Sequence, residues 1–266
     1  MAKLKSWVQI SILAAELLYG SRVSSTTLYI YIPSDVRAKV IQDKVTKTCP
    51  SVDISVFSRF QDFSIRLANT PADGIISLPP TIKKSHYSII SSGKHLGNST
   101  DKFVLVSLNR KGSLRATMPL KDSTMPLKPN SAPLKPSSAS LKPSSTSLKI
   151  GVVDILGRKP MNTYVEKLLG KKVKLKRVTK PANLLPLLSF GSVDAILVPK
   201  RYLAILKEDS KLKFITSELD LSQGLTALAM NPDNSLNNKT SRELLINCVL
   251  AFDLATKQIM GVETWE

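Results

Sequence analysis

Two arginines stand directly after strand-like runs of this sequence, one in each half of the chain. Arg59 follows "VDISVF", and Arg158 follows "LKIGVVDIL". A guanidinium binds a carboxylate or a phosphate through two parallel, charge-assisted hydrogen bonds. We therefore expect Arg59 and Arg158 to clamp a small anion. The alternative is that each is an ordinary solvated surface charge.

Other polar side chains follow the same runs. In open α/β sheets, ligands bind beyond the carboxyl ends of the strands, where helix N-termini present free N–H groups. This rule selects, as candidate ligand-binding residues, Ser34, Asp35, Arg59, Phe60, Thr81, Asp154, Arg158, Asn162, Thr163, Lys180, Asn183, Arg201 and Tyr202. Three bland alternatives stay open: Ser34 as a helix cap, Lys180 as a surface charge, and Phe60 and Tyr202 as packing residues.

The elements that would position these residues alternate between strand and helix. In the first half, strand-like runs at 27–35, 52–57 and 72–80 alternate with helical spacing at 36–49 and 60–69. The second half repeats this order, with strand-like runs at 148–156, 172–178 and 193–201 and helices at 161–170 and 182–192. Both halves read β-α-β-α-β, which predicts an α/β protein of two lobes, each a mostly parallel sheet flanked by helices.

Two further apolar runs and a terminal helix complete the order. Residues 102–109 and 224–232 suit strands that cross between the lobes, and 241–260 has helical spacing. The predicted domains are lobe 1 at 26–108, a linker at 109–148, lobe 2 at 149–223, and a return strand and helix at 224–266 that pack on lobe 1.

The linker contains a tandem repeat. Leucine recurs every seven residues from Leu120 to Leu148, and each of these leucines is followed by lysine. A coiled coil is excluded, because each unit has one apolar position where a seam needs two, and Pro129, Pro136 and Pro143 would break a helix. The composition predicts a disordered, partly polyproline II linker. A P-x-x-P ligand is the alternative role.

Residues 1–25 resemble a secretory signal peptide. Lys3 and Lys5 precede an apolar stretch that ends at Leu18, and Val23 and Ser25 are small residues suited to a cleavage site. Glu16 within the apolar stretch favours the alternative, an amphipathic first helix. No other stretch reaches the length of a membrane span, so we expect no transmembrane segment in the mature protein.

The net charge of +18 is unevenly spread. Residues 1–25 have a net charge of +2 and residues 109–149 of +7, which leaves +9 for the rest of the chain. This excess favours anionic partners without requiring nucleic acid. The run "KKVKLKRV" is read as a half-exposed strand, with a nucleic-acid face as the alternative.

Cofactor and catalytic motifs are missing from the sequence. The two cysteines, Cys49 and Cys248, form no C-x-x-C motif, and the two histidines form no H-E-x-x-H motif, so no metal or cofactor is expected. The cysteines could pair or remain two buried thiols. We find no G-x-S-x-G, Walker or dinucleotide motif, and therefore expect no enzyme. Asp35 or Asp154 could still act as a general base on the same fold.

The order of lobe, crossing strand, lobe, crossing strand and helix resembles the type II periplasmic solute-binding proteins of ABC transporters. The segment "SFGSVDAILVPKRYLAIL" is similar to phosphate- and phosphonate-type members. The resemblance implies two lobes that close on a small ligand, and a membrane permease as partner. The turn "DILGRKPMNTY" departs from the Ser/Thr-rich turn of phosphonate-type members, which argues against a phosphonate ligand.

We therefore expect an exported, monomeric, periplasmic solute-binding protein that captures a small anionic solute for ABC-type uptake. Two alternatives stay open. One is a cytoplasmic enzyme or ligand sensor on the same fold, and the other is a basic nucleic-acid-binding protein.

The repeat region yields a first prediction. Deletion of residues 119–146 should leave folding and ligand binding largely unchanged, because a spacer of this composition buries no apolar area. Circular dichroism and ligand titration of the shortened chain test this. Loss of either property would show that the segment packs against the folded protein.

Overall fold

The computed structural model describes residues 25–109, 148–208, 210, 212–233 and 238–266. The expected signal peptide and the repeat linker lie outside the described residues, apart from their ends. Among the described residues, those up to Thr100, Ile155–Gly157 and those from Gly224 onward form one compact unit, called unit 1. Asp101–Asp154 and Arg158–Gln223 supply the second, called unit 2.

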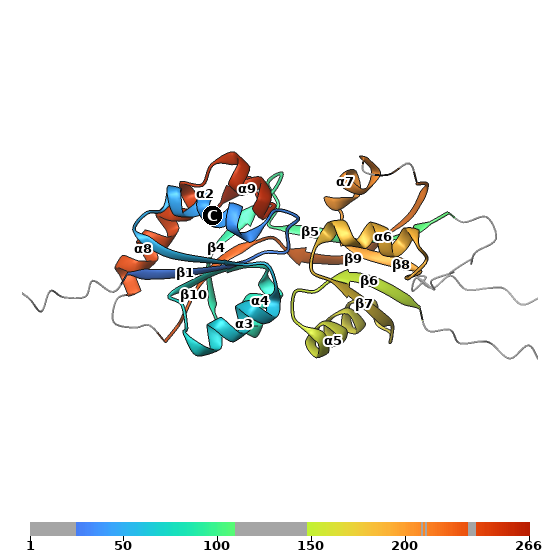
Figure 1. The fold of residues 1–266 in the computed structure, drawn as a ribbon, viewed down its shortest axis with the longest axis horizontal. Coiled ribbons are helices and arrows are strands. Elements are labelled where there is room, and N and C mark those ends of the chain that lie inside the picture. Colours follow the sequence, from blue (N-terminus) through green and yellow to red (C-terminus); the bar gives the residue numbers. More distant parts are fainter. Residues whose placement is uncertain (1–24, 110–147, 209, 211, 234–237) are drawn as a thin grey trace, which may run out of the picture. The chain divides into compact units, whose positions relative to one another are not determined.

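Unit 1 is built on a six-stranded sheet (Figure 1). Its strands, in spatial order, are β11 (Thr264–Trp265), β4 (Ser88–Lys94), β10 (Ala227–Met230), β3 (Gly74–Ser77), β1 (Thr26–Tyr31) and β2 (Val52–Phe57). Strand β1 pairs in parallel with β2 and β3, whereas β10 and β4 form antiparallel pairs. The sheet is therefore mixed, with a parallel part made by the β-α-β-α-β segment that the sequence predicts.

Helices cover both faces of this sheet. Figure 1 shows α2 (Ala38–Thr48), α8 (Asn238–Leu250) and α9 (Leu254–Met260) on one face, and α3 (Phe60–Asn69) and α4 (Pro79–Lys84) on the other. An apolar core lies on each face of the sheet, and side chains of β1 point alternately into the two. Leu28 and Ile30 pack in the core beneath α2, α8 and α9, and Tyr29 and Tyr31 pack in the core beneath α3 and α4. Burial on both faces explains why residues 28–31 of β1 form a continuous apolar run with no polar alternation.

Unit 2 contains a five-stranded sheet. Its strands, in spatial order, are β7 (Lys174–Val178), β6 (Lys149–Val153), β8 (Ala195–Pro199), β5 (Thr100–Leu108) and β9 (Phe214–Gly224). Strand β6 is parallel to β7 and β8, and β5 is antiparallel to β8. Helix α5 (Arg158–Leu169) covers one face, and the other face carries η1 (Pro181–Asn183), α6 (Leu184–Ser189) and α7 (Tyr202–Glu208) (Figure 1).

Equivalent aspartates fix the start of the first strand of the β-α-β-α-β segment in each unit, which is β1 in unit 1 and β6 in unit 2. The Asp73 carboxylate accepts a hydrogen bond from the Thr27 backbone N–H at 2.7 Å, and the Asp194 carboxylate accepts one from the Lys149 backbone N–H at 2.8 Å. Asp73 precedes β3 and Asp194 precedes β8. Both residues therefore lie at the end of the sheet opposite the carboxyl ends of the parallel strands.

Two details differ from the sequence prediction. The expected single helix at 241–260 is two helices, because the chain turns at residues 251–253 and the Asp253 carboxylate caps α9 by accepting from the Thr256 N–H at 2.7 Å. The predicted run at 224–232 is also divided, since β9 ends at Gly224 and β10 begins at Ala227. Side-chain capping of this kind gives no signal in apolar periodicity.

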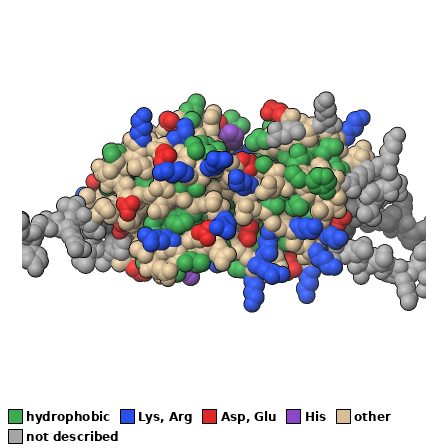
Figure 2. All heavy atoms as spheres, in the orientation of Figure 1, with side chains coloured by type: hydrophobic (Ala, Val, Ile, Leu, Met, Phe, Trp, Pro, Cys, Tyr) green, Lys and Arg blue, Asp and Glu red, His purple; other side chains and the backbone are tan. Residues whose placement is uncertain are grey.

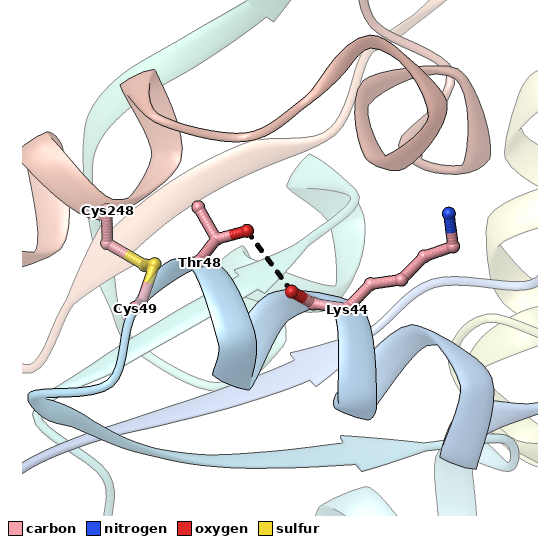
Figure 3. The surroundings of a disulfide bond; sticks show 4 residues. All are labelled: Lys44, Thr48, Cys49 and Cys248. Carbon is pink, nitrogen blue, oxygen red and sulfur yellow. Dashed lines mark hydrogen bonds between the residues drawn. A yellow bond between two sulfur atoms is a disulfide. The ribbon is translucent and has the colours of Figure 1, made fainter.

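A disulfide joins the two cysteines, which resolves the alternative left open by the sequence. Cys49 caps the C-terminal end of α2, and Cys248 lies in α8, with the Cα atoms 5.5 Å apart (Figure 3). Next to it, the Thr48 hydroxyl donates to the Lys44 carbonyl at 3.1 Å. The bond spans 199 residues of sequence and ties the C-terminal helix region to the first helix of unit 1.

We expect Cys49→Ser or Cys248→Ser to destabilise unit 1 by about 2–5 kcal/mol, since a crosslink that closes a long loop restricts the unfolded chain. Chemical denaturation under oxidising and reducing conditions measures this. The double variant should match either single variant. If reduction leaves the wild-type midpoint unchanged, the bond does not contribute to stability.

Candidate functional site

The carboxyl ends of the parallel strands in unit 1 lie at one edge of the sheet, and the candidate site is built there. Strands β1, β2 and β3 end at Tyr31, Phe57 and Ser77. The buried Ser77 hydroxyl donates to the Tyr31 carbonyl at 2.7 Å, which holds two of these ends together. Helix α4 begins two residues after Ser77, so its side chains belong to the same edge.

Helix α4 supplies two hydrogen-bond donors to this edge. The Thr81 hydroxyl, which is fully buried, donates to the Ile155 carbonyl at 2.8 Å. The Lys84 ammonium, three residues on, donates to the Leu156 carbonyl at 2.8 Å. Because residues i and i+3 share one face of a helix, both donors are directed at one short piece of backbone.

Phe60 forms the apolar wall of this donor pair. The Lys84 ammonium lies 4.4 Å from the centroid of the Phe60 ring, within the range of a cation–π interaction. The ring also packs edge-to-face on Tyr31, with centroids 5.8 Å apart. Gly157 lies against the same ring. A Cβ atom at Gly157 would approach the Phe60 ring to 3.2 Å, and its φ of +77° favours glycine.

The chemistry of this site is recognition of oxygen acceptors. A hydroxyl and an ammonium hold two consecutive carbonyl oxygens, those of Ile155 and Leu156, and the aromatic face of Phe60 lies against the ammonium. A ligand carboxylate presents two oxygen acceptors close together and carries a charge opposite to that of Lys84. The arrangement therefore suits a carboxylate as well as it suits the backbone that now occupies it.

The remaining predicted residues of unit 1 lie in the turns before α2 and α3. The Ser34 hydroxyl accepts from the Val36 N–H at 3.1 Å, so it stabilises its own turn. Asp35 is exposed in the same turn. Arg59 precedes α3, and its guanidinium forms an exposed ion pair with Asp62 at 3.0 Å.

The predicted residues of unit 2 also lie at the carboxyl edge of its parallel strands. Asp154 follows β6, and its N–H donates to the Val178 carbonyl at 2.8 Å. Arg158 is the first residue of α5, and Asn162 and Thr163 are exposed one turn later. Lys180 precedes η1, and Asn183 ends it.

Tyr164, also in α5, has a partly buried side chain. Burial raises the pKa of Tyr164 to about 12. Its hydroxyl therefore stays neutral even at moderately alkaline pH.

Arg201 and Tyr202 follow β8 at the same edge. The Arg201 guanidinium lies 5.5 Å from the centroid of the Tyr202 ring and 3.9 Å from the Asp101 carboxylate. The Asp101 carboxylate also accepts from the Arg201 backbone N–H at 3.2 Å. Tyr202 packs against the apolar core of the sheet face that carries α6, as its packing alternative anticipates.

Thus the structure brings together Phe60 and Thr81 and adds Lys84, which sequence reasoning missed. The signal was present, because Lys84 follows Thr81 at helical spacing in a run that follows a strand. Residues 155–157 accept these hydrogen bonds and contact the Phe60 ring, and the sequence does not indicate this. These contacts depend on the packing of segments that are distant in the sequence. The clamp between Arg59 and Arg158 stays a prediction. The two residues belong to different units, and Arg59 forms an ion pair with Asp62.

Solved structures with a similar fold include proteins bound to amino acids and a protein of an ABC transporter. The L-arginine-bound protein Tv2483 is 14% identical with a TM-score of 0.53, over 98% of this chain and 96% of that one. A Listeria monocytogenes protein assigned to an L-cystine ABC transporter is 9% identical with a TM-score of 0.53, over 91% and 98%. An ancestral arginine-binding protein bound to glutamine is 16% identical with a TM-score of 0.50, over 88% and 95%.

The chain therefore has the two-lobed fold of type II periplasmic solute-binding proteins. These neighbours are of the amino-acid type, so the expected phosphate- and phosphonate-type resemblance is not supported. At these identities the likeness establishes the fold alone. No known family profile matches the sequence, and no curated protein is detectably similar to it.

The described part of the chain contains no cluster of three or more His, Cys, Asp or Glu side chains suited to a metal ion. None of its helices is both long enough and apolar enough to cross a membrane.

The buried Thr81 hydroxyl should contribute to the stability of unit 1. Thr81→Val keeps the side-chain shape but removes the donor to the Ile155 carbonyl, and should cost about 1–3 kcal/mol in the free energy of unfolding. Thr81→Ser keeps the hydroxyl and should cost less. Urea denaturation compares the two variants, and equal losses would mean that the hydrogen bond contributes nothing.

Proposed function

We propose that this protein binds a small amino-acid-like solute at the carboxyl edge of its parallel strands and delivers it to a membrane permease without altering it. The observation that carries the proposal is the Thr81 and Lys84 donor pair beside the Phe60 ring. This pair would bind the α-carboxylate of the solute through charge-assisted hydrogen bonds.

The backbone of residues 155–157 now accepts those two hydrogen bonds, so the solute must compete with it. A carboxylate is the stronger acceptor, because it is charged and the carbonyls are not. Release of the Ile155 and Leu156 carbonyls would accompany solute binding. Domain closure on a ligand in this class of fold uses local rearrangements of this kind.

The solute is proposed to be zwitterionic, in place of the net anion expected from the sequence. The neighbours with bound ligand contain L-arginine and glutamine, both of which have an α-carboxylate and an α-ammonium group. In unit 2, Asp154 supplies a carboxylate, whose negative charge is opposite to that of an ammonium group. Asn162 and Thr163 supply neutral polar groups. Their roles are part of the same proposal.

Export to an oxidising compartment fits this function. The Cys49–Cys248 disulfide forms and persists in secreted or periplasmic proteins, whereas cytosolic thiols are kept reduced. The signal-like sequence at residues 1–25 agrees with this compartment. A permease partner follows from the transport role and is proposed with it.

A thermal-shift titration with L-arginine, L-glutamine and L-cystine, with phosphate and methylphosphonate in parallel, tests the proposal. We expect at least one amino acid to raise the melting temperature in proportion to the logarithm of its concentration. Lys84→Met should weaken that ligand at least about tenfold, as expected for the loss of a charged hydrogen bond.

Lys83→Met is the matched control, because Lys83 is the neighbouring exposed lysine in the same helix and lies outside the donor pair. It should leave the affinity unchanged. If no amino acid shifts the melting temperature of the folded protein, the proposed solute class is wrong. If Lys83→Met and Lys84→Met weaken binding equally, the donor pair is not the site.

A further inference from the structure

Positive charge is concentrated in one segment of the described chain. Residues 149–180, which form β6, α5 and β7, contain ten Lys and Arg and only two acidic residues, a net charge of +8. The described residues of unit 1 contain twelve basic and ten acidic residues, a net charge of +2. The basic excess of the folded protein therefore belongs to one part of unit 2.

Five lysines of this segment gather at the edge where the parallel strands begin. Strands β6 and β7 start at Lys149 and Lys174, and the Lys174 N–H donates to the Leu148 carbonyl at 2.9 Å. Lys171 and Lys172 lie in the turn before β7, and Lys167 lies near the end of α5, which runs towards the same edge. In Figure 2 the blue side chains gather over α5 and β7.

These five lysines are all exposed, and none takes part in an ion pair recorded among the described residues. The edge also contains Asp194, whose carboxylate already accepts the Lys149 backbone N–H at 2.8 Å. The lysine charges are therefore available to a partner. We call the five lysines the basic edge.

An exposed aromatic ring lies at the same end of the sheet. Phe190 caps the C-terminal end of α6, which runs from the end of β7 back to the start of β8, and 84% of its surface is accessible. A phenylalanine this exposed forms no part of the apolar core. An exposed ring at the same end of a sheet as exposed lysines suits a lipid surface, where the ring inserts at the headgroup boundary and the ammonium groups bind phosphates.

We propose that the basic edge and Phe190 dock the protein on a membrane surface that contains anionic phospholipid. This edge is opposite the carboxyl ends of β6, β7 and β8, so docking leaves the candidate ligand edge of unit 2 uncovered. The inference is independent of the proposed solute, because it uses none of the residues of that site.

Two observations favour lipid over nucleic acid as the partner. The basic edge contains lysines and no arginine, whereas reading of base edges and bidentate phosphate binding depend largely on arginine. The disulfide indicates an oxidising compartment. There, a lipid leaflet is the extended anionic surface that the protein meets.

Co-sedimentation of the full chain with lipid vesicles tests the proposal. Vesicles of phosphatidylcholine with 30% phosphatidylglycerol are compared with pure phosphatidylcholine, at low and at high salt. We expect binding to the anionic vesicles that is lost as salt rises. K171E/K172E/K174E should weaken it at least about 100-fold, because each basic residue near an anionic surface contributes severalfold to binding.

The control K47E/K83E/K239E makes the same change in net charge on exposed lysines of unit 1 and should weaken binding less than about threefold. Phe190→Ser should weaken binding about fivefold or more at every salt concentration, since the burial of apolar area is not screened. Both triple variants should retain the wild-type melting temperature within a few degrees. If K171E/K172E/K174E unfolds, K171Q/K172Q/K174Q replaces it, with an expected loss of at least about tenfold.

Three outcomes would overturn the proposal. The first is equal binding to both kinds of vesicle. The second is equal weakening by the two triple variants, which would assign binding to net charge alone. The third is binding to single-stranded RNA or heparin through the basic edge with no binding to anionic vesicles, which would identify a soluble polyanion as the partner.

Discussion

Parallel pairing of β1 with β2 and β3, and of β6 with β7 and β8, is the constraint on which the rest of the structure depends. It sends every connecting helix back across a sheet face, so all strands of a set begin at one edge and end at the other. Each unit therefore has two edges with separate chemistry. The aspartates that fix the first strand lie at the amino edge, and the Thr81 and Lys84 donors lie at the carboxyl edge of unit 1.

The donor pair in unit 1 has two requirements that oppose each other. A buried hydroxyl with no partner is costly, so the Thr81 hydroxyl needs an acceptor when no solute is bound. The Ile155 carbonyl supplies that acceptor, and Gly157 allows the chain to approach the Phe60 ring. The same contacts reduce the affinity of any ligand that must displace them. A charged acceptor, which binds more strongly than a carbonyl, is the ligand best able to do so.

The sequence was sufficient for the features that depend on local pattern. Apolar periodicity located the β-α-β-α-β order of both halves, because the alternation of strand and helix is a local signal. The break before α9 and the mixed character of the sheets were not found, since they depend on one cap and on pairing of distant strands. Lys84 was overlooked for a similar reason: its partner, the Leu156 carbonyl, is 72 residues away in the sequence.

The net charge of +18 gives little information about partners until it is divided along the fold. Unit 1 is nearly balanced, with twelve basic and ten acidic residues described, so its field at long range is weak. The strand order of unit 2 makes β7 the outermost strand of the sheet and brings the turn before β7 next to the start of β6.

Lysines on an outermost strand also hinder pairing with a strand of another chain, and this is a sufficient reason for Lys174 and Lys176. That reason does not extend to Lys167, Lys171 and Lys172, which lie outside the strand, nor to the exposed ring of Phe190. The proposed docking on an anionic membrane surface accounts for those residues.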